Sequence, residues 1–221
     1  QEATLAYTCK NLFLKNDHLL TTNYVDRAVY HQAIFLGYYQ LLGKNRIKDA
    51  YFYAAKAMAG FAKSEINKLV SEVIQSEGEV LGTQNIFGLK VAKGLIVRPQ
   101  VRTLMKLLLA AKCKIYVVTA SSEEVVKAAL KFWSFPEVVC IGVRNKEING
   151  VFSDTIEKLS PVIDGKVTCI KKFVSKDKKP ILAVGDNMND LPMLEYSCLK
   201  VVVNRENVLS QKAKEEKWYI I

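Results

Sequence analysis

The feature that most restricts the fold of this chain is an apolar segment that ends in two aspartates. Residues 181–184 are Ile-Leu-Ala-Val, a run typical of a buried strand, and Gly185, Asp186 and Asp190 follow it. An apolar strand ending in Gly-Asp-x-x-x-Asp places oxygen ligands at the carboxyl edge of a parallel sheet, where open α/β sheets bind ligands. Paired carboxylates there suit Mg²⁺. A strand followed by an Asp-capped helix explains the same residues equally well.

The size and charge of the chain exclude some classes of protein. Its 221 residues suffice for one large domain or a domain with an insert, and no apolar run reaches the roughly 18 residues of a membrane span. The net charge of +10 can attract phosphorylated metabolites, nucleic acid or anionic membranes, but solvated helix faces with surplus lysine explain it more simply. No RNA-binding aromatic signature or DNA-reading helix is present, so nucleic acid is not favoured. We expect a cytoplasmic protein. The start at Gln1 leaves a cleaved signal peptide, and hence secretion or a periplasmic location, open.

The cysteines indicate a reducing compartment. There are five of them, the number is odd, and no pair has the C-x-x-C spacing of a zinc or redox site. We therefore expect reduced and mostly buried thiols rather than disulfides.

The hydrophobic pattern changes along the chain and predicts two kinds of structure. Between about residues 22 and 90, apolar residues recur at intervals of three and four, which indicates several amphipathic helices. From about residue 98, apolar runs alternate with helical patterns, which indicates a parallel sheet covered on both faces. The expected strands are residues 115–118, 138–141, 181–184 and 200–203, and the expected helices are residues 99–111, 123–133, 165–174 and 191–196. The prediction is an α/β fold with a Rossmann-like parallel sheet, built from residues 1–21 and 91–221, and a helical insert at residues 22–90.

The order of the motifs resembles one family. A short strand with an acidic loop comes first, then the helical insert, a strand ending in Thr119, Lys166 at a helix start, and the segment from Gly185 to Asp190. This order is similar to that of the haloacid dehalogenase (HAD) superfamily, in its phosphoserine-phosphatase-like branch with an all-helical cap. The resemblance covers nearly the whole chain.

The resemblance implies a role for each motif in phosphoryl transfer, which depends mostly on positioning and charge stabilisation. Thr119, Ala120 and Ser121 would bind phosphate oxygens through hydroxyl and amide groups, and Lys166 would neutralise the phosphate. Asp186 would bind Mg²⁺ directly together with an acidic residue of the first motif, and Asp190 would assist as a further ligand or as a hydrogen-bond acceptor.

The first motif departs from the family pattern. The family has Asp-x-Asp-x-Thr after the first strand, where the first aspartate attacks phosphorus and the second is the acid/base. Here Lys15 occupies the nucleophile position, Asp17 the position of the acid/base and metal ligand, and Leu19 that of the threonine. A protonated lysine has no lone pair, so we expect hydrolysis to be lost or severely impaired. Its ammonium would also compete with Mg²⁺ for the carboxylates, so magnesium binding would be weak or absent. A Lys15 side chain that extends into solvent is the alternative.

Three functions are compatible with these residues. The first is a phosphatase-like pseudoenzyme that keeps a phosphate pocket and binds a small phosphorylated ligand or a protein partner. The second is an active Mg²⁺-dependent phosphomonoesterase that acts on a small metabolite or a lipid head group. The third is a basic module for nucleic acid or membrane surfaces that reuses the fold. Hydrolysis of p-nitrophenyl phosphate by the wild type separates the first two.

Overall fold

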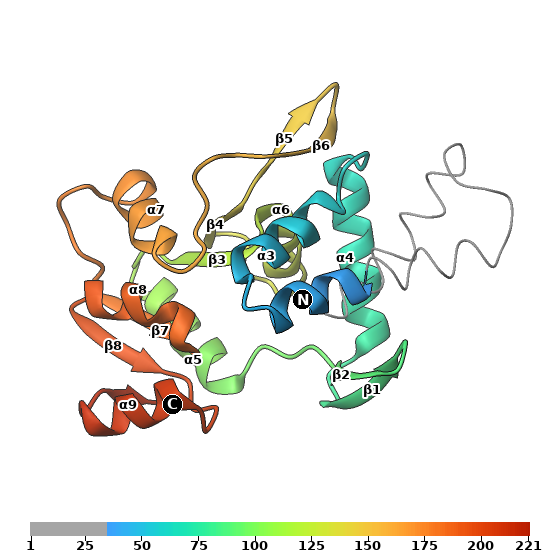
Figure 1. The fold of residues 1–221 in the computed structure, drawn as a ribbon. Helices are drawn as coiled ribbons and strands as arrows, with labels where there is room; N and C mark the ends of the chain where they lie inside the picture. Colours follow the sequence, from blue (N-terminus) through green and yellow to red (C-terminus); the bar gives the residue numbers. More distant parts are fainter. Residues whose placement is uncertain (1–34) are drawn as a thin grey trace, which may run out of the picture. The chain divides into compact units, whose positions relative to one another are not determined.

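The computed structural model describes residues 35–221, and Figure 1 follows their helices and strands along the chain. These residues divide into two units. The first unit contains residues 35–97, 121–136 and 143–157, and the second contains residues 98–120, 137–142 and 158–221. Lys15, Asp17 and Leu19 lie outside the described residues, so the predictions for the first motif are not tested by the structure.

The second unit contains a three-stranded parallel sheet. Its strands are β7 (Leu182–Gly185), β8 (Leu199–Val202) and β9 (Tyr219–Ile220), in the order β7-β8-β9. Helix α8 (Leu191–Tyr196) connects β7 to β8, and α9 (Val208–Glu215) connects β8 to β9. Each connection contains a helix, and parallel strands need a long crossover connection of this kind.

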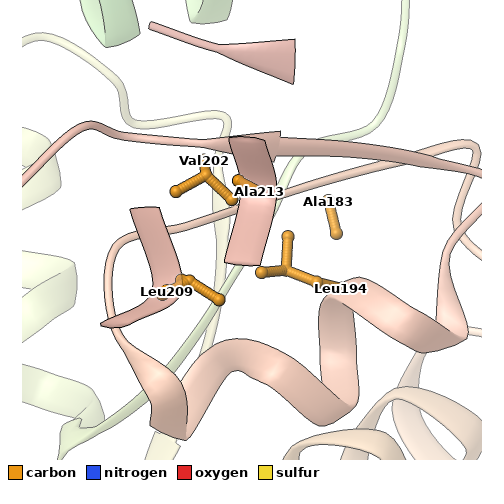
Figure 2. Packing of buried hydrophobic residues seen from close by; sticks show 5 residues of the cluster. All are labelled: Ala183, Leu194, Val202, Leu209 and Ala213. Atoms are coloured by element: carbon orange, nitrogen blue, oxygen red, sulfur yellow. The ribbon is translucent and has the colours of Figure 1, made fainter. Parts of the chain in front are cut away.

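A compact apolar cluster attaches these two helices to the sheet. Figure 2 shows its side chains pointing toward one another from β7, α8, β8 and α9, and their exposed fractions are 6% or less. Leu191, Met193 and Trp218 pack around it. The members are Ala183, Leu194, Val202, Leu209 and Ala213. Because the cluster includes residues of β7 and α8, which precede and follow the turn after β7, it holds both ends of that turn in place.

Two further strands pair with each other. They are β3 (Tyr116–Ser122) and β4 (Val139–Val143), and α6 (Glu123–Phe132) follows β3 and precedes β4 along the chain. The predicted strand at residues 115–118 is present, but it continues through the polar residues that we expected to form a loop. Pairing with β4 satisfies backbone groups whatever the side chains are, so a change to polar residues does not end the strand. Helices α5 (Pro99–Ala110) and α7 (Gly165–Phe173) match their predictions within a residue.

The first unit is helical with two added hairpins. Residues 35–43 are helical, and α3 (Ile47–Lys56) and α4 (Lys63–Glu77) follow, with Ile66, Val70, Val73 and Ile74 buried along one face of α4. The periodicity therefore predicted these helices correctly. It did not predict the antiparallel hairpins. They are β1 (Gly82–Ile86) with β2 (Leu89–Lys93), and β5 (Asn145–Ile148) with β6 (Val151–Ile156).

A buried carboxylate in the first unit is held by two cations. The side chain of Glu123, at the start of α6, is only 6% exposed and accepts from Arg144 Nε at 2.7 Å. Lys127 Nζ lies 2.7 Å from the other carboxylate oxygen and 3.0 Å from Glu124 Oε1. Burial alone would lower the pKa of Lys127, but its hydrogen bonds to the two glutamates outweigh this and raise that pKa above its ordinary value.

The architecture confirms the predicted α/β class with parallel strands. The boundaries of a separate helical cap stay a prediction. No helix within residues 35–221 has the length and apolarity needed to cross a membrane. Among the described cysteines, Cys140 and Cys169 are buried, but Cys113 and Cys198 are exposed. The prediction of mostly buried thiols is wrong for those two because both lie in short connections that precede strands.

Candidate functional site

The lysine at the start of α7 is the most constrained residue of the candidate site. The Lys166 side chain is 7% exposed, and its Nζ donates to Asp190 Oδ1 at 2.5 Å and to the Val118 carbonyl oxygen at 3.2 Å. A Cβ on Gly165 would collide with the backbone oxygen of Ser160, so only glycine fits before the lysine. Lys166 thus joins α7 to β3 and to the turn after β7.

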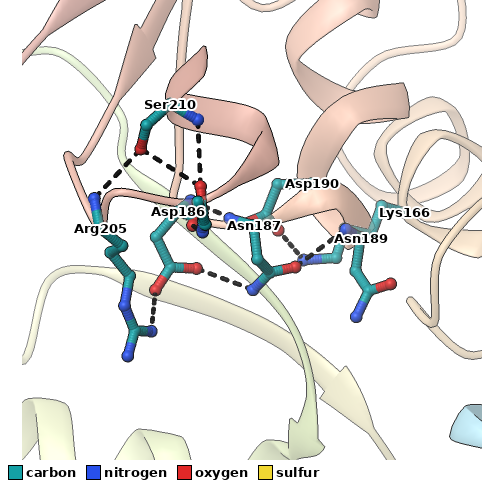
Figure 3. Close-up of polar contacts among 8 residues, drawn as sticks. Lys166, Asp186, Asn187, Asn189, Asp190, Arg205 and Ser210 are labelled. Carbon is teal, nitrogen blue, oxygen red and sulfur yellow. Dashed lines mark hydrogen bonds and ion pairs between the residues drawn. The ribbon is translucent and has the colours of Figure 1, made fainter. Parts of the chain in front are cut away.

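The turn after β7 is organised around Asp190. Its Oδ2 accepts from the backbone nitrogen of Asp186 at 2.9 Å and from that of Asn187 at 3.4 Å (Figure 3). The Asn187 side chain caps the short helix η1 (Met188–Asp190) by accepting from the backbone nitrogen of Asn189. A Cβ at Gly185 would lie 2.5 Å from the Asp190 Cβ, so the glycine allows the carboxylate to fold back. Asp190 therefore supports the turn in addition to its ion pair with Lys166.

The other aspartate of the motif has a different environment. The Asp186 side chain is 37% exposed, and its Oδ2 accepts from Arg205 Nη1 at 2.7 Å. Its Oδ1 accepts from Asn187 Nδ2 at 2.8 Å, and its backbone oxygen accepts from Asn207 Nδ2 at 2.8 Å. Figure 3 shows the Arg205 guanidinium at the Asp186 carboxylate.

Arg205 belongs to this site but to none of the sequence motifs. The register of the sheet is the signal that could have found it. Gly185 is the register partner of Val202 on β8, so the residues that follow the two strands lie at the same edge. An arginine three residues after the end of β8 is within reach of an aspartate directly after β7.

The predicted phosphate-binding residues are placed only in part. Thr119, Ala120 and Ser121 follow one another on β3, and Lys166 Nζ bonds to the carbonyl oxygen of Val118, directly before Thr119. The structure therefore brings the predicted lysine to the strand that carries the predicted hydroxyl group. Phosphate binding by these residues stays a prediction.

The described residues do not by themselves fit a magnesium centre. Mg²⁺ prefers several oxygen ligands in octahedral geometry. All four carboxylate oxygens of Asp186 and Asp190 already accept from nitrogen donors of the protein. Within residues 35–221, no three His, Cys, Asp or Glu side chains gather closely enough to hold a metal ion. A metal would have to displace the Arg205 guanidinium or share Asp186 with it.

Comparison with known families agrees with the motif order. The family model of the haloacid dehalogenase-like hydrolases matches residues 3–195. The chain belongs to this family. No curated protein sequence matches it significantly.

Solved structures share the HAD fold at low sequence identity. A protein of unknown function from Bordetella pertussis Tohama I has a TM-score of 0.70 at 16% identity, with 98% of this chain and 91% of that chain covered. A substrate-bound phosphoserine phosphatase has a TM-score of 0.57 at 12% identity, with coverage of 99% and 85%. Cytosolic 5′-nucleotidase IIIB bound to cytidine has a TM-score of 0.53 at 13% identity, with coverage of 96% and 64%. These similarities show the fold, and the site residues of this chain must be judged by their own geometry.

Proposed function

We propose that this chain is a HAD-family phosphatase-like protein that binds a small phosphorylated ligand and has lost most or all hydrolase activity. The observation that carries the binding half is the position of Lys166. Its buried ammonium pairs with Asp190 in the turn after β7 and donates to the carbonyl oxygen of Val118 on β3, so the lysine lies beside the residue that precedes Thr119. Open α/β sheets bind ligands at the carboxyl ends of their strands.

The loss of hydrolysis is proposed from the first motif. Lys15 stands where the family carries its aspartate nucleophile, and Leu19 replaces the threonine. Removing a catalytic nucleophile can lower kcat by a factor on the order of 10⁶. Asp17, Asp186 and Asp190 alone supply no group that attacks phosphorus in the family mechanism.

Hydrolysis of p-nitrophenyl phosphate with added Mg²⁺ tests this half of the proposal. We expect no turnover by the wild type and a measurable gain in Lys15→Asp, because the substitution restores a carboxylate nucleophile. The gain should be lost again in Lys15→Asp combined with Asp186→Ala. Turnover by the wild type that Asp186→Ala abolishes would refute the pseudoenzyme and support an active Mg²⁺-dependent phosphomonoesterase.

Titration with inorganic phosphate tests the binding half. Thr119→Ala removes the hydroxyl group predicted to bind a phosphate oxygen, so it should weaken binding by about ten- to a hundredfold, because one hydrogen bond to a charged group contributes about 1.5–3 kcal/mol. Thr155→Ala, on the exposed part of β6, is the matched control and should leave the affinity unchanged. Equal affinities of the two variants would contradict a phosphate site at Thr119.

A further inference from the structure

The strongest unexplained feature of the site is the cation on Asp186. Arg205 Nη1 lies 2.7 Å from Asp186 Oδ2, a length typical of a charge-assisted hydrogen bond. The motif predicts Mg²⁺ at this carboxylate, yet an arginine of the same chain donates to it.

The protein positions both partners of this ion pair through its backbone. The backbone nitrogen of Arg205 donates to Ser210 Oγ at 3.1 Å, and Ser210 is 1% exposed. Asn207 accepts from the Ser210 backbone nitrogen at 3.0 Å, and its Nδ2 donates to the Asp186 carbonyl oxygen at 2.8 Å. The segment after β8 is therefore anchored to the segment after β7, and this anchoring separates the pair from a chance contact between two surface side chains.

The charges of the described site already balance. Lys166 neutralises Asp190 and Arg205 neutralises Asp186, so two carboxylates face two cations. A divalent ion binds well where carboxylate charge is in excess, and such an excess is missing here among the described residues. We propose that Arg205 replaces a divalent metal ion as the counter-charge of Asp186, which makes the site a poor metal site although both aspartates of the motif are present.

This proposal goes beyond the proposed function and does not rest on Lys15. The expected effect of Arg205 on metal affinity follows from electrostatics. A guanidinium that shares one carboxylate with a divalent ion repels that ion across a few ångströms, and in a solvent-exposed site this repulsion corresponds to about a tenfold change in affinity. Salt screens exposed charges, so the effect is largest at low ionic strength.

Calorimetric titration of the full chain with Mn²⁺ at low ionic strength tests the proposal. We expect Arg205→Gln to bind Mn²⁺ about tenfold more tightly than the wild type. Arg98→Gln is the matched control, since it removes the same charge from an exposed arginine at the N-cap of α5 and should leave the affinity unchanged. The added affinity must vanish in Arg205→Gln combined with Asp186→Asn, which shows that the metal binds at this carboxylate.

Two outcomes overturn the proposal. One is wild-type binding of Mn²⁺ as tight as that of Arg205→Gln. The other is Mn²⁺ binding by Arg205→Lys that is as tight as that of Arg205→Gln. The lysine keeps the positive charge, so the affinity of Arg205→Lys should stay near that of the wild type. If Arg205→Gln folds poorly by circular dichroism, Arg205→Met, which keeps the aliphatic stem, carries the same comparison. Hydrolysis by the wild type would refute the pseudoenzyme proposal without affecting these binding differences, so the two failures are distinguishable.

Discussion

Replacing Lys166 by methionine should destabilise the protein strongly, because it leaves the Asp190 carboxylate buried without its cation. The two side chains are only 7% and 10% exposed, and breaking a buried ion pair by removing one partner costs about 3–5 kcal/mol. Asp190 keeps two backbone donors, from Asp186 and Asn187, which offset part of the loss. We therefore expect the lower end of the range, about 3 kcal/mol.

Urea unfolding measures this loss. With a slope of about 2 kcal/mol per molar urea, typical of small proteins, a loss of about 3 kcal/mol lowers the midpoint by about 1.5 M. Trp218 packs against the apolar cluster of the same unit as the pair, so it contributes a fluorescence signal for the unfolding of that unit, in addition to the signal of Trp133. Lys68→Met is the control, because Lys68 forms an exposed pair with Glu72 at 3.9 Å and should lose no more than about 0.5 kcal/mol.

The double variant Lys166→Met with Asp190→Asn tests the reason for the loss. The asparagine oxygen can still accept from the backbone nitrogens of Asp186 and Asn187, but no buried charge remains. We expect the double variant to be at least about 1 kcal/mol more stable than Lys166→Met alone. A double variant that is equally or less stable would refute the argument that the unpaired carboxylate causes the loss.

Two further predictions concern Gly165, next to Lys166, and the ion pairs of Lys127 in the first unit. Gly165→Ala should lower the unfolding free energy by more than about 1 kcal/mol, because the new Cβ meets the Ser160 backbone oxygen. Gly82→Ala has open space around its Cβ and should change the unfolding free energy by less. Thermal unfolding compares the two variants, and equal melting temperatures would contradict the steric argument. Lys127→Met should cost about 0.5–1 kcal/mol at pH 7, discounted for the exposure of the lysine. The pKa of Lys127 is raised in the folded state, so the contribution of Lys127 to stability is complete below the ordinary lysine pKa of about 10.4. This contribution disappears as the pH rises through the folded pKa. In urea titrations, the stability difference between variant and wild type should therefore shrink at high pH. A difference that persists at high pH, or that the exposed Lys131→Met on the same helix reproduces, would show that the ion pairs are not responsible.

The predictability of each element depended on how local its signal is. Helices α5 to α8 and strands β4, β7 and β8 were expected within about two residues, since each has its own apolar pattern and a polar or glycine boundary. The β1–β2 hairpin has no such pattern. Its first strand is Gly-Thr-Gln-Asn-Ile and is largely exposed, so pairing rather than burial defines it. The positive φ angles at Phe87 and Gly88 form its turn, and only the glycine is a visible sequence signal for them.

The candidate site was predictable to the extent that its residues belong to recognisable motifs. Lys166 and Asp190 lie 24 positions apart and were both named, but their direct pairing depends on α7 and η1 meeting beside β3. Arg205 carries no motif. Its place at Asp186 follows from the register of β7 and β8, which is a property of the folded sheet and has no local signal.

The two aspartates of the motif show why an intact motif is a weak guide to chemistry. From the sequence, Asp186 is expected to bind the metal ion directly, and Asp190 is expected to assist it as a further ligand or as a hydrogen-bond acceptor. In the structure, Asp190 is buried, its oxygens accept from Lys166 and from two backbone nitrogens, and it is committed to supporting the turn. Asp186 is partly exposed, so it alone could exchange partners with solvent or a ligand, and Arg205 now pairs with it. Within residues 35–221, metal binding at this motif would therefore depend on the Asp186 carboxylate and on the arginine that competes for it, rather than on the presence of the motif.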